Sequence, residues 1–354
     1  MYIPEAWHVI AIRRELRRAH REPVALRRFG LDLVLWRDAE GKLRAVLDRC
    51  PHRSASLSAG AVKDGQIECP FHGFRWDGEG NCVKVPCNGP EAQRPRHLAN
   101  TAFELREAHD MVWMWWGQPR AAGDYPELPW SGPFAAVDEG YVHDTLVETT
   151  QVGWMRNVEN QLDWAHLPFA HHNTIGTGFP PDIEVRAELD GDLLSCWPAH
   201  YEDDEGVPHT PLHYMFPNTW IMAVGGPNNY SVIAFAPVDE THTRMYLRTY
   251  VKRGRVPGLA ALIARVFRPA NRVIFKQDQR IIETQPPGGT VGARDEKLVQ
   301  ADLPIALFRK EVRRRMEAHA KPEESGSSSS SSSEGSGDSQ TVQLRVPEPN
   351  ERAS

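Results

Sequence analysis

Cys50-Pro-His52 and, after sixteen intervening residues, Cys69-Pro-Phe-His72 decide the fold of the N-terminal part of this chain. Each stretch places one thiol and one imidazole within four residues. The sequence therefore predicts two similar short loops that together present two thiolates and two imidazoles. Short β-rich segments surround both stretches, so we expect a small antiparallel β domain that carries the two loops.

Two cysteines on one iron and two histidines on the other are the ligands of a Rieske [2Fe–2S] cluster. A structural zinc site with two cysteines and two histidines is the alternative. Such a zinc site normally pairs cysteine with cysteine and histidine with histidine at short spacings, which differs from the mixed pairs seen here. We therefore predict that the chain transfers electrons through a cluster bound by Cys50, His52, Cys69 and His72.

The residues beside these motifs indicate the type of cluster. Rieske proteins of the respiratory bc type carry an extra cysteine in each loop, and Ala55 and Phe71 occupy the corresponding places here. Phe74 follows Gly73 where those proteins have a serine. Fewer hydrogen bonds to the cluster predict a reduction potential at the low end of the Rieske range.

Length, charge and cysteine content narrow the class of protein. A chain of 354 residues is long enough for two domains, and a formal net charge of −6 gives no reason to expect nucleic acid or an anionic membrane as a partner. We find no apolar stretch of membrane-spanning length and no secretory signal at the N-terminus, so we expect a cytoplasmic protein. Apart from the two predicted cluster ligands, the chain has three cysteines, Cys82, Cys87 and Cys196. An odd number of remaining cysteines argues against a framework of disulfide bonds.

The pattern along the chain predicts an α+β protein in which an N-terminal antiparallel β domain precedes a helix-grip domain, an antiparallel sheet that holds a long helix. We expect two strands within 24–47, a hairpin turning at Asp77-Gly78, strands at 141–150 and within 183–251, and helices at 153–166, 257–284 and 301–319. The predicted divisions are a cluster domain at 1–118, a Pro/Gly-rich linker at 119–139, a second metal domain at 140–320 and a disordered Ser-rich tail at 321–354.

A second group of metal-binding residues follows the linker. Asn160, Asp163 and His166 recur at intervals of three, so a helix over 153–166 would place them on one face, and Pro168 would bend the chain and bring His171 near His166. Two histidines with one carboxylate form the facial triad of non-heme Fe(II) centres, which leaves coordination positions open for O2. A histidine pair near a helix end is otherwise often a surface or capping feature.

With both groups present, the chain resembles the terminal oxygenase (alpha) component of the Rieske non-heme iron oxygenases over roughly residues 5 to 315. It is most similar in pattern to the alpha-only group that includes the vanillate O-demethylases. The resemblance implies that the third iron ligand is an aspartate on a late helix, and KQDQRIIETQ offers Asp278, with Glu283 as the competitor. His172 competes with His171, but only His171 has the family's four-residue gap from His166.

The resemblance also assigns roles to two other residues. Asp163 corresponds to an aspartate that lies between a cluster histidine of one subunit and an iron histidine of the next in homotrimers, and His72 is the cluster histidine implied. Asn160 would support the iron pocket, with packing or capping as an equally good interpretation.

The activity implied is reductive O2 activation. A separate NAD(P)H-dependent reductase, alone or with a ferredoxin, would supply electrons, because the chain has no flavin or dinucleotide motif. We favour monooxygenation or oxidative dealkylation of an aromatic or hydrophobic small molecule over cis-dihydroxylation of a ring. Two alternatives remain: a Rieske electron-transfer protein without oxygenation activity, and a binding protein of the same fold that lacks turnover.

Overall fold

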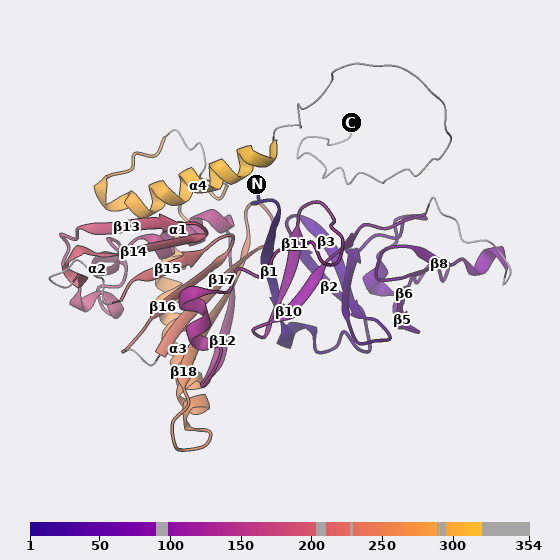
Figure 1. Ribbon diagram of the computed structural model, residues 1–354, viewed down its shortest axis with the longest axis horizontal. Coiled ribbons are helices and arrows are strands. Elements are labelled where there is room, and N and C mark those ends of the chain that lie inside the picture. Colours follow the sequence, from indigo (N-terminus) through magenta and orange to yellow (C-terminus); the bar gives the residue numbers. More distant parts are fainter. Residues whose placement is uncertain (90–97, 203–209, 227–228, 289, 291–294, 321–354) are drawn as a thin grey trace, which may run out of the picture.

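The computed structural model describes residues 1–89, 98–202, 210–226, 229–288, 290 and 295–320 (Figure 1). The tail predicted at 321–354 lies outside the described residues. Figure 1 shows small sheets at one end of the molecule and one large sheet with helices at the other. The predicted α+β fold, a β domain followed by a sheet that holds helices, is confirmed.

Three small antiparallel sheets form the N-terminal part. One sheet has the order β1-β11-β10, a second β2-β3-β4-β9 and a third β5-β6-β7-β8. Their bounds are β1 Ala6–Ile12, β2 Val24–Arg28, β3 Leu31–Arg37, β4 Leu43–Leu47, β5 Ala61–Lys63, β6 Gln66–Glu68, β7 Arg75–Trp76, β8 Cys82–Lys84, β9 Ala102–Phe103, β10 Leu105–Ala108 and β11 Met111–Trp116.

The prediction of two strands within 24–47 is wrong, because β2, β3 and β4 occupy this segment. Phe29 and Gly30 adopt φ values of 54° and 76°, so the chain reverses between β2 and β3 where the alternating pattern suggested one continuous strand. The hairpin predicted around Asp77-Gly78 is present between β7 and β8. The Asp77 carboxylate accepts the backbone N–H groups of Glu79 and Asn81 and so closes that turn.

A single antiparallel sheet with the order β12-β18-β17-β16-β15-β14-β13 forms the centre of the second part. Its strands are β12 Tyr141–Thr150, β13 Val185–Asp190, β14 Leu193–Pro198, β15 Leu212–Met215, β16 Thr219–Ala223, β17 Asn229–Pro237 and β18 Thr243–Lys252. The first and last long strands in the sequence, β12 and β18, pair along ten residues. The pair is antiparallel, so the end of β12 lies beside the start of β18, and the helix that follows β18 packs back along both strands to reach the end of β12.

The described residues form four α-helices beside this sheet: α1 Trp154–Leu162, α2 Leu167–Ala170, α3 Leu259–Ile282 and α4 Leu303–Ala320. Short 3-10 helices are η1 Arg13–Leu16, η2 Leu57–Ala59, η3 Pro86–Asn88, η4 Gly132–Val137, η5 Ile175–Gly178, η6 Ala199–Tyr201 and η7 Gln300–Asp302. The continuous helix predicted over 153–166 is wrong. It ends at Leu162, and Asp163 is extended with φ −84° and ψ 115°.

The two faces of the large sheet are covered differently. Trp154 and Val158 of α1, Phe275 of α3 and Phe308 of α4 pack on one face, and all four are buried. On the other face, Trp7 and other side chains of β1 and β11 pack against strands β15 to β18. Burial of each large apolar side chain contributes about 2 to 3 kcal/mol, so this shared core fixes the N-terminal part against the sheet.

The segment predicted as a linker, 119–139, also enters this core, because Trp130, Phe134 and Val137 are buried there. In the part of the chain that the structure describes, no helix combines the length and the apolar character needed to cross a membrane.

Candidate functional site: two metal centres

The loops that carry the two Cys-His motifs are closed by the same backbone hydrogen bonds. In the first loop, the Cys50 N–H donates to the carbonyl of Ala55, and Ser54 donates to the carbonyl of Cys50. In the second, Cys69 donates to Phe74 and Gly73 donates to Cys69, with the same sequence offsets. The residue four positions after each cysteine is left-handed, with φ of 60° at Ser54 and 69° at Gly73. The predicted similarity of the two loops therefore extends to their backbone conformation.

Their side chains form a site with a buried and an exposed half. Cys50 and Cys69 are buried, whereas the ring of His52 is exposed and stacks on Phe74. The His52 and His72 rings lie 4.8 Å apart. Burial, with a smaller contribution from neighbouring Cys69, raises the pKa of the Cys50 thiol to about 11, so a metal that binds this thiol at neutral pH would displace its proton. His72 Nδ1 is buried with no hydrogen-bond partner among the described residues, as expected of an atom that binds metal.

The arrangement of these four residues differs from a zinc site. One zinc ion would bring its donor atoms within about 4 Å of one another, given metal–ligand distances near 2.0 to 2.3 Å. Among the described residues, only His166, His171 and Asp278 form a group of three or more donors within 4.8 Å of one another. No three donor atoms of the Cys-His loops therefore lie within 4.8 Å of one another, a wider spacing than a single zinc ion needs. All five cysteines are free, so no disulfide joins the loops.

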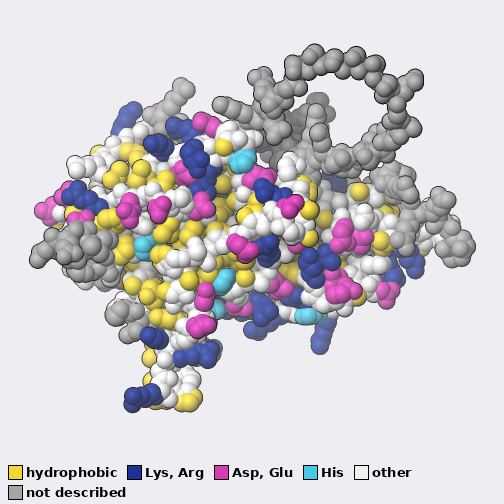
Figure 2. All heavy atoms as spheres, viewed as in Figure 1, with side chains coloured by type: hydrophobic (Ala, Val, Ile, Leu, Met, Phe, Trp, Pro, Cys, Tyr) yellow, Lys and Arg dark blue, Asp and Glu magenta, His cyan; other side chains and the backbone are white. Residues whose placement is uncertain are grey.

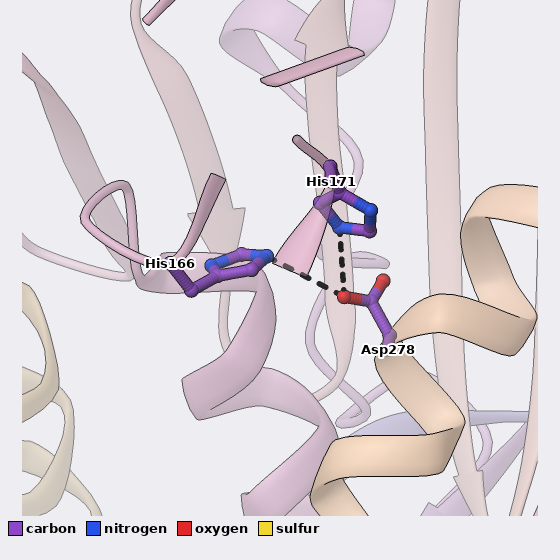
Figure 3. A group of neighbouring side chains, drawn as sticks. All are labelled: His166, His171 and Asp278. Atoms are coloured by element: carbon purple, nitrogen blue, oxygen red, sulfur yellow. Dashed lines mark hydrogen bonds and ion pairs between the residues drawn. The ribbon is translucent and has the colours of Figure 1, made fainter. Parts of the chain in front are cut away.

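The second centre joins side chains that are more than 100 residues apart in the sequence (Figure 3). His171 Nε2 lies 2.9 Å and His166 Nε2 lies 3.4 Å from the same oxygen of Asp278, Oδ1. His171 is 1% and Asp278 8% exposed by side chain, while His166 retains 18%. Two imidazoles and one carboxylate that converge from one side can hold a single metal ion and leave other positions open.

The break after α1 positions both histidines. The Asp163 carboxylate accepts the N–H of Ala165 at 2.7 Å, so the chain turns there and the helix ends. His166 then precedes α2, and Pro168 lies in the first turn of α2, where its missing N–H costs no hydrogen bond. His171 follows the end of α2 after one helical turn, which brings its ring to 5.2 Å from that of His166.

Each imidazole is oriented by the nitrogen that does not face Asp278. His166 Nδ1 lies 2.7 Å from the backbone carbonyl of Asp163, and His171 Nδ1 lies 2.8 Å from Oε1 of Gln277. An N–H donated at Nδ1 leaves the lone pair on Nε2, the nitrogen directed toward Asp278. The other oxygen of Asp278, Oδ2, is 3.4 Å from the side-chain nitrogen of Gln161.

Gln161 and Gln277 were missed by the sequence reasoning. Gln277 immediately precedes Asp278, and the polar run KQDQ marks it as a candidate for closer inspection. No signal in the sequence singles out Gln161, because its contact with Asp278 depends on the packing of α1 against α3.

Asp278 and His171 each shift the pKa of the other toward its charged form. Burial opposes ionisation of Asp278, but hydrogen bonds from His166 and His171 outweigh it and hold the pKa of the carboxyl well below its usual range. Burial lowers the pKa of His171, but the hydrogen bonds to Asp278 and Gln277 and the charge of Asp278 together outweigh this, so its pKa is raised. A cation at this position would replace the shared protons as the partner of the carboxylate.

Other predicted residues lie at varying distances from this cluster. The Oδ2 atom of Asp163 lies 3.7 Å from His166 Nδ1, and burial raises the pKa of the Asp163 carboxyl. Asn160 is partly exposed on α1. His172 is exposed and contacts the carbonyl of Phe169. Glu283 follows the end of α3, where it accepts the N–H of Gln151 and the amide of Gln279. The structure therefore brings Asp278, and neither Glu283 nor His172, to the histidine pair.

A groove runs along the outer side of α3 beside α2. Its lining includes Gln277 but not His166, His171 or Asp278, so this groove is a surface feature beside the metal site. Its residues are Ala170, His172, Asn173, Arg268, Pro269, Arg272, Val273, Lys276, Gln277 and Arg280.

Comparison with known protein families identifies both parts of the chain. Residues 6–102 match the Rieske [2Fe-2S] domain, and residues 151–321 match the vanillate O-demethylase oxygenase C-terminal domain. This pair of domains makes the chain similar to the terminal components of Rieske oxygenases. The first match contains all four residues of the Cys-His loops, and the second contains His166, His171 and Asp278.

Curated relatives of this chain include enzymes with different reactions. It is 27% identical over 237 residues to the oxygenase subunit of 3-chlorobenzoate-3,4-dioxygenase from Comamonas testosteroni, covering 63% of this chain and 54% of the relative. It is 33% identical over 170 residues to the oxygenase component of dicamba O-demethylase from Stenotrophomonas maltophilia, covering 48% of each protein. The chain spans 34% to 54% of the length of the first curated relatives that it matches.

A solved structure of NdmA from Pseudomonas putida CBB5 with caffeine has the same fold. The TM-score is 0.71 at 23% sequence identity, and the similarity covers 89% of this chain and 91% of NdmA. At this identity the similarity shows that the two proteins share a fold. The order of a Rieske β domain before a catalytic domain of antiparallel sheet and helices is thereby confirmed.

Proposed function

We propose that this chain is a Rieske-type terminal oxygenase component that uses O2 for monooxygenation or oxidative dealkylation of an aromatic or hydrophobic small molecule. The convergence of His166, His171 and Asp278 carries the proposal, because a chain that only transferred electrons would need no second metal site. These three residues would hold one Fe(II). Residues Cys50, His52, Cys69 and His72 would hold the [2Fe–2S] cluster.

The residues of the chain prepare the mononuclear site in three ways. The acceptors at Nδ1 orient both imidazoles so that Nε2 faces Asp278, ionised Asp278 supplies one negative charge, and burial limits competition by water. When bound, the cluster supplies single electrons and the Fe(II) supplies O2 activation beside a substrate. We infer that Asp163 takes part in electron passage to His166, and that Asn160 supports the pocket from α1.

Oxidative demethylation balances with an external reductant. A methyl ether, O2, NAD(P)H and H⁺ would give a hydroxyl compound, formaldehyde, water and NAD(P)⁺. The match to the vanillate O-demethylase C-terminal domain and the similarity to dicamba O-demethylase support dealkylation. The relative named as a 3-chlorobenzoate dioxygenase keeps ring dihydroxylation as the second candidate. Turnover under ¹⁸O2 separates the two, because a dihydroxylated product carries two labelled oxygens and demethylation releases formaldehyde.

The partners that we propose are a separate NAD(P)H-dependent reductase, alone or with a ferredoxin, and further copies of the same chain in a homotrimer. The reductase is supported by the dicamba relative, which is named as the oxygenase component of its system. The trimer is supported by Figure 1, in which the strands next to the cluster loops, β5 to β8, lie at one end of the molecule and α2 at the other. Electrons would then pass between chains. The cytoplasmic location stays a prediction.

One apolar surface also supports self-association. Six large apolar side chains on one face of α3 are between 37% and 66% exposed, and Figure 2 shows hydrophobic and basic side chains together on the protruding end where α3 begins. They are Leu259, Leu262, Ile263, Val266, Phe267 and Val273. A continuous apolar face of this kind indicates a protein interface.

Light scattering after size exclusion tests the oligomer. Wild-type protein should elute as a trimer, and Val266→Asp should reduce its mass. Ala261→Asp, which adds the same charge to a different side of α3, should not. A wild-type monomer would contradict the trimer and leave the metal sites untouched.

The function itself is tested on anaerobically purified protein. Iron and acid-labile sulfide analysis should give one [2Fe–2S] cluster and one further iron per chain. With a Rieske oxygenase reductase and a panel of methoxylated aromatic acids, NADH oxidation should become coupled to O2 uptake and formaldehyde release. A cluster without mononuclear iron, and without substrate-dependent O2 uptake, would instead indicate an electron-transfer protein.

A further inference from the structure

Gln277 is the residue of α3 that contacts His171 from the side opposite Asp278. Its Oε1 atom lies 2.8 Å from His171 Nδ1 and also accepts the hydroxyl of Thr174 at 2.8 Å. Its Nε2 atom donates to Oδ1 of Asn173 at 2.7 Å. Both ends of this amide are therefore engaged by the turn that carries His171.

The two histidines differ in what orients them. His166 donates to the backbone carbonyl of Asp163, an acceptor that no side-chain substitution removes. His171 donates to a side chain on another helix. At Nδ1, His171 thus depends on the Gln277 side chain, which couples α3 to the chain segment after α2.

The direction of the Gln277 amide determines which nitrogen of His171 is free. With Oε1 toward the ring, Nδ1 carries a proton, and Nε2, which shares a proton with Asp278, is the nitrogen that a metal ion would take in place of that proton. A reversed amide would present N–H groups to Nδ1 and favour a proton on Nε2, the atom that would bind metal. The carbonyl oxygen of Asn173 accepts from Nε2 and so favours the observed direction, in which the hydroxyl of Thr174 donates to Oε1.

We propose that Gln277 is a positioning residue, held by Thr174 and Asn173, that selects the metal-binding tautomer of His171. The inference rests on the proposed function of the His166, His171 and Asp278 site. A neutral amide at this place also leaves Asp278 as the single anion of the donor set. A carboxylate there would increase the basicity of the imidazole and favour ferric over ferrous iron.

Three variants distinguish the loss of the hydrogen-bond acceptor, the gain of a negative charge, and a nonspecific effect of a substitution on α3. Gln277→Leu removes the acceptor at similar size, Gln277→Glu keeps an acceptor and adds a charge, and Gln279→Leu is the matched control. Gln279 lies on the same helix, where its amide contacts Glu283 and the carbonyl of Thr149.

The measurement is anaerobic titration of mononuclear-iron-depleted protein with Fe(II), followed by the EPR signal of the Fe(II)–nitric oxide complex. The reduced-cluster EPR signal reports that each variant is folded. Gln277→Leu should bind Fe(II) about 10- to 100-fold more weakly, the usual effect of losing such a hydrogen-bond partner. Gln277→Glu should bind Fe(II) with an affinity within a few-fold of wild type, and its redox titration should show that the ferric state is favoured more than in wild type. Gln279→Leu should have the Fe(II) affinity of wild type.

Equal Fe(II) affinity of wild type and Gln277→Leu would overturn the proposal, as would equal weakening by Gln279→Leu. If Gln277→Leu does not fold, Thr174→Val tests the same network, since it removes the hydroxyl that orients the amide and should weaken Fe(II) binding several-fold. Wild-type affinity in Thr174→Val would then overturn the proposed selection. A wild-type protein that binds no Fe(II) at this site contradicts the proposed function itself.

Discussion

Replacement of Gly176 by alanine should remove the mononuclear iron while leaving the cluster in place. Gly176 lies in η5, where its N–H donates to the carbonyl of His171. A Cβ at this position would lie 1.9 Å from the carbonyl oxygen of Leu167 and 2.9 Å from that of His171. Both are backbone atoms, so the clash cannot be relieved by rotating a side chain.

The size of the effect follows from these distances. Carbon–oxygen contacts are rarely closer than about 3.3 Å, so η5 and the start of α2 must separate by more than about 1 Å. Metal sites tolerate ligand displacements of about 0.2 Å, and this movement would act on the turn between His166 and His171. We expect Fe(II) binding at least about 10-fold weaker, a loss above about 1.4 kcal/mol. Turnover should fall about 100-fold.

Gly178→Ala is the matched control, since an added Cβ there meets no atom within 4 Å. Iron and sulfide analysis of both variants, with the reduced-cluster EPR signal as a check of folding, should show depleted mononuclear iron only in Gly176→Ala. Full iron occupancy and wild-type turnover in Gly176→Ala would refute the reasoning, because the loop would then hold His171 in more than one backbone arrangement.

Three further outcomes are expected. Asp278→Ala should remove the mononuclear iron and Glu283→Ala should keep it, so the opposite result in metal analysis would reassign the third ligand. Asp163→Asn should keep both metal centres, because an amide oxygen still accepts the Ala165 N–H, yet slow cluster reoxidation by O2 and substrate about 10-fold in stopped-flow experiments. Burial lowers the pKa of His8 to about 4, so the unfolded state takes up a proton first as pH falls below about 6.5. Burial of neutral His8 should therefore lower the free energy of unfolding by about 3 kcal/mol in total as the pH falls from 6.5 to 4. Urea unfolding should show a smaller decrease for His8→Gln than for wild type over this pH range. Equal decreases in the two proteins would contradict this prediction.

The Cys-His loops could be predicted from the sequence because their conformation is local. The closing hydrogen bonds of each loop span four or five residues, and the left-handed position falls on Gly73 in one loop and Ser54 in the other. The short spacing within each motif is therefore sufficient to predict these loops. The strand count in 24–47 was missed because the positive φ of Phe29 is unusual for an aromatic residue and leaves the alternating pattern intact.

The second metal site was only partly predictable. The spacing of His166 and His171 is visible in the sequence, but the expected shared helical face with Asn160 and Asp163 does not exist, because Asp163 ends α1. The hydrogen bond from Ala165 to the Asp163 carboxylate competes with helix continuation, a choice that propensity alone does not resolve.

The sequence by itself determined the two ligand motifs, the order of the two parts and the chemistry that they favour. The tertiary structure alone decided which late acidic residue meets the histidines, and it added Gln161 and Gln277 as their partners. The physical reason is the range of the interactions. A loop closed by its own backbone needs only nearby residues, whereas Asp278 reaches His171 because β12 and β18 pair along their length and α3 packs against them.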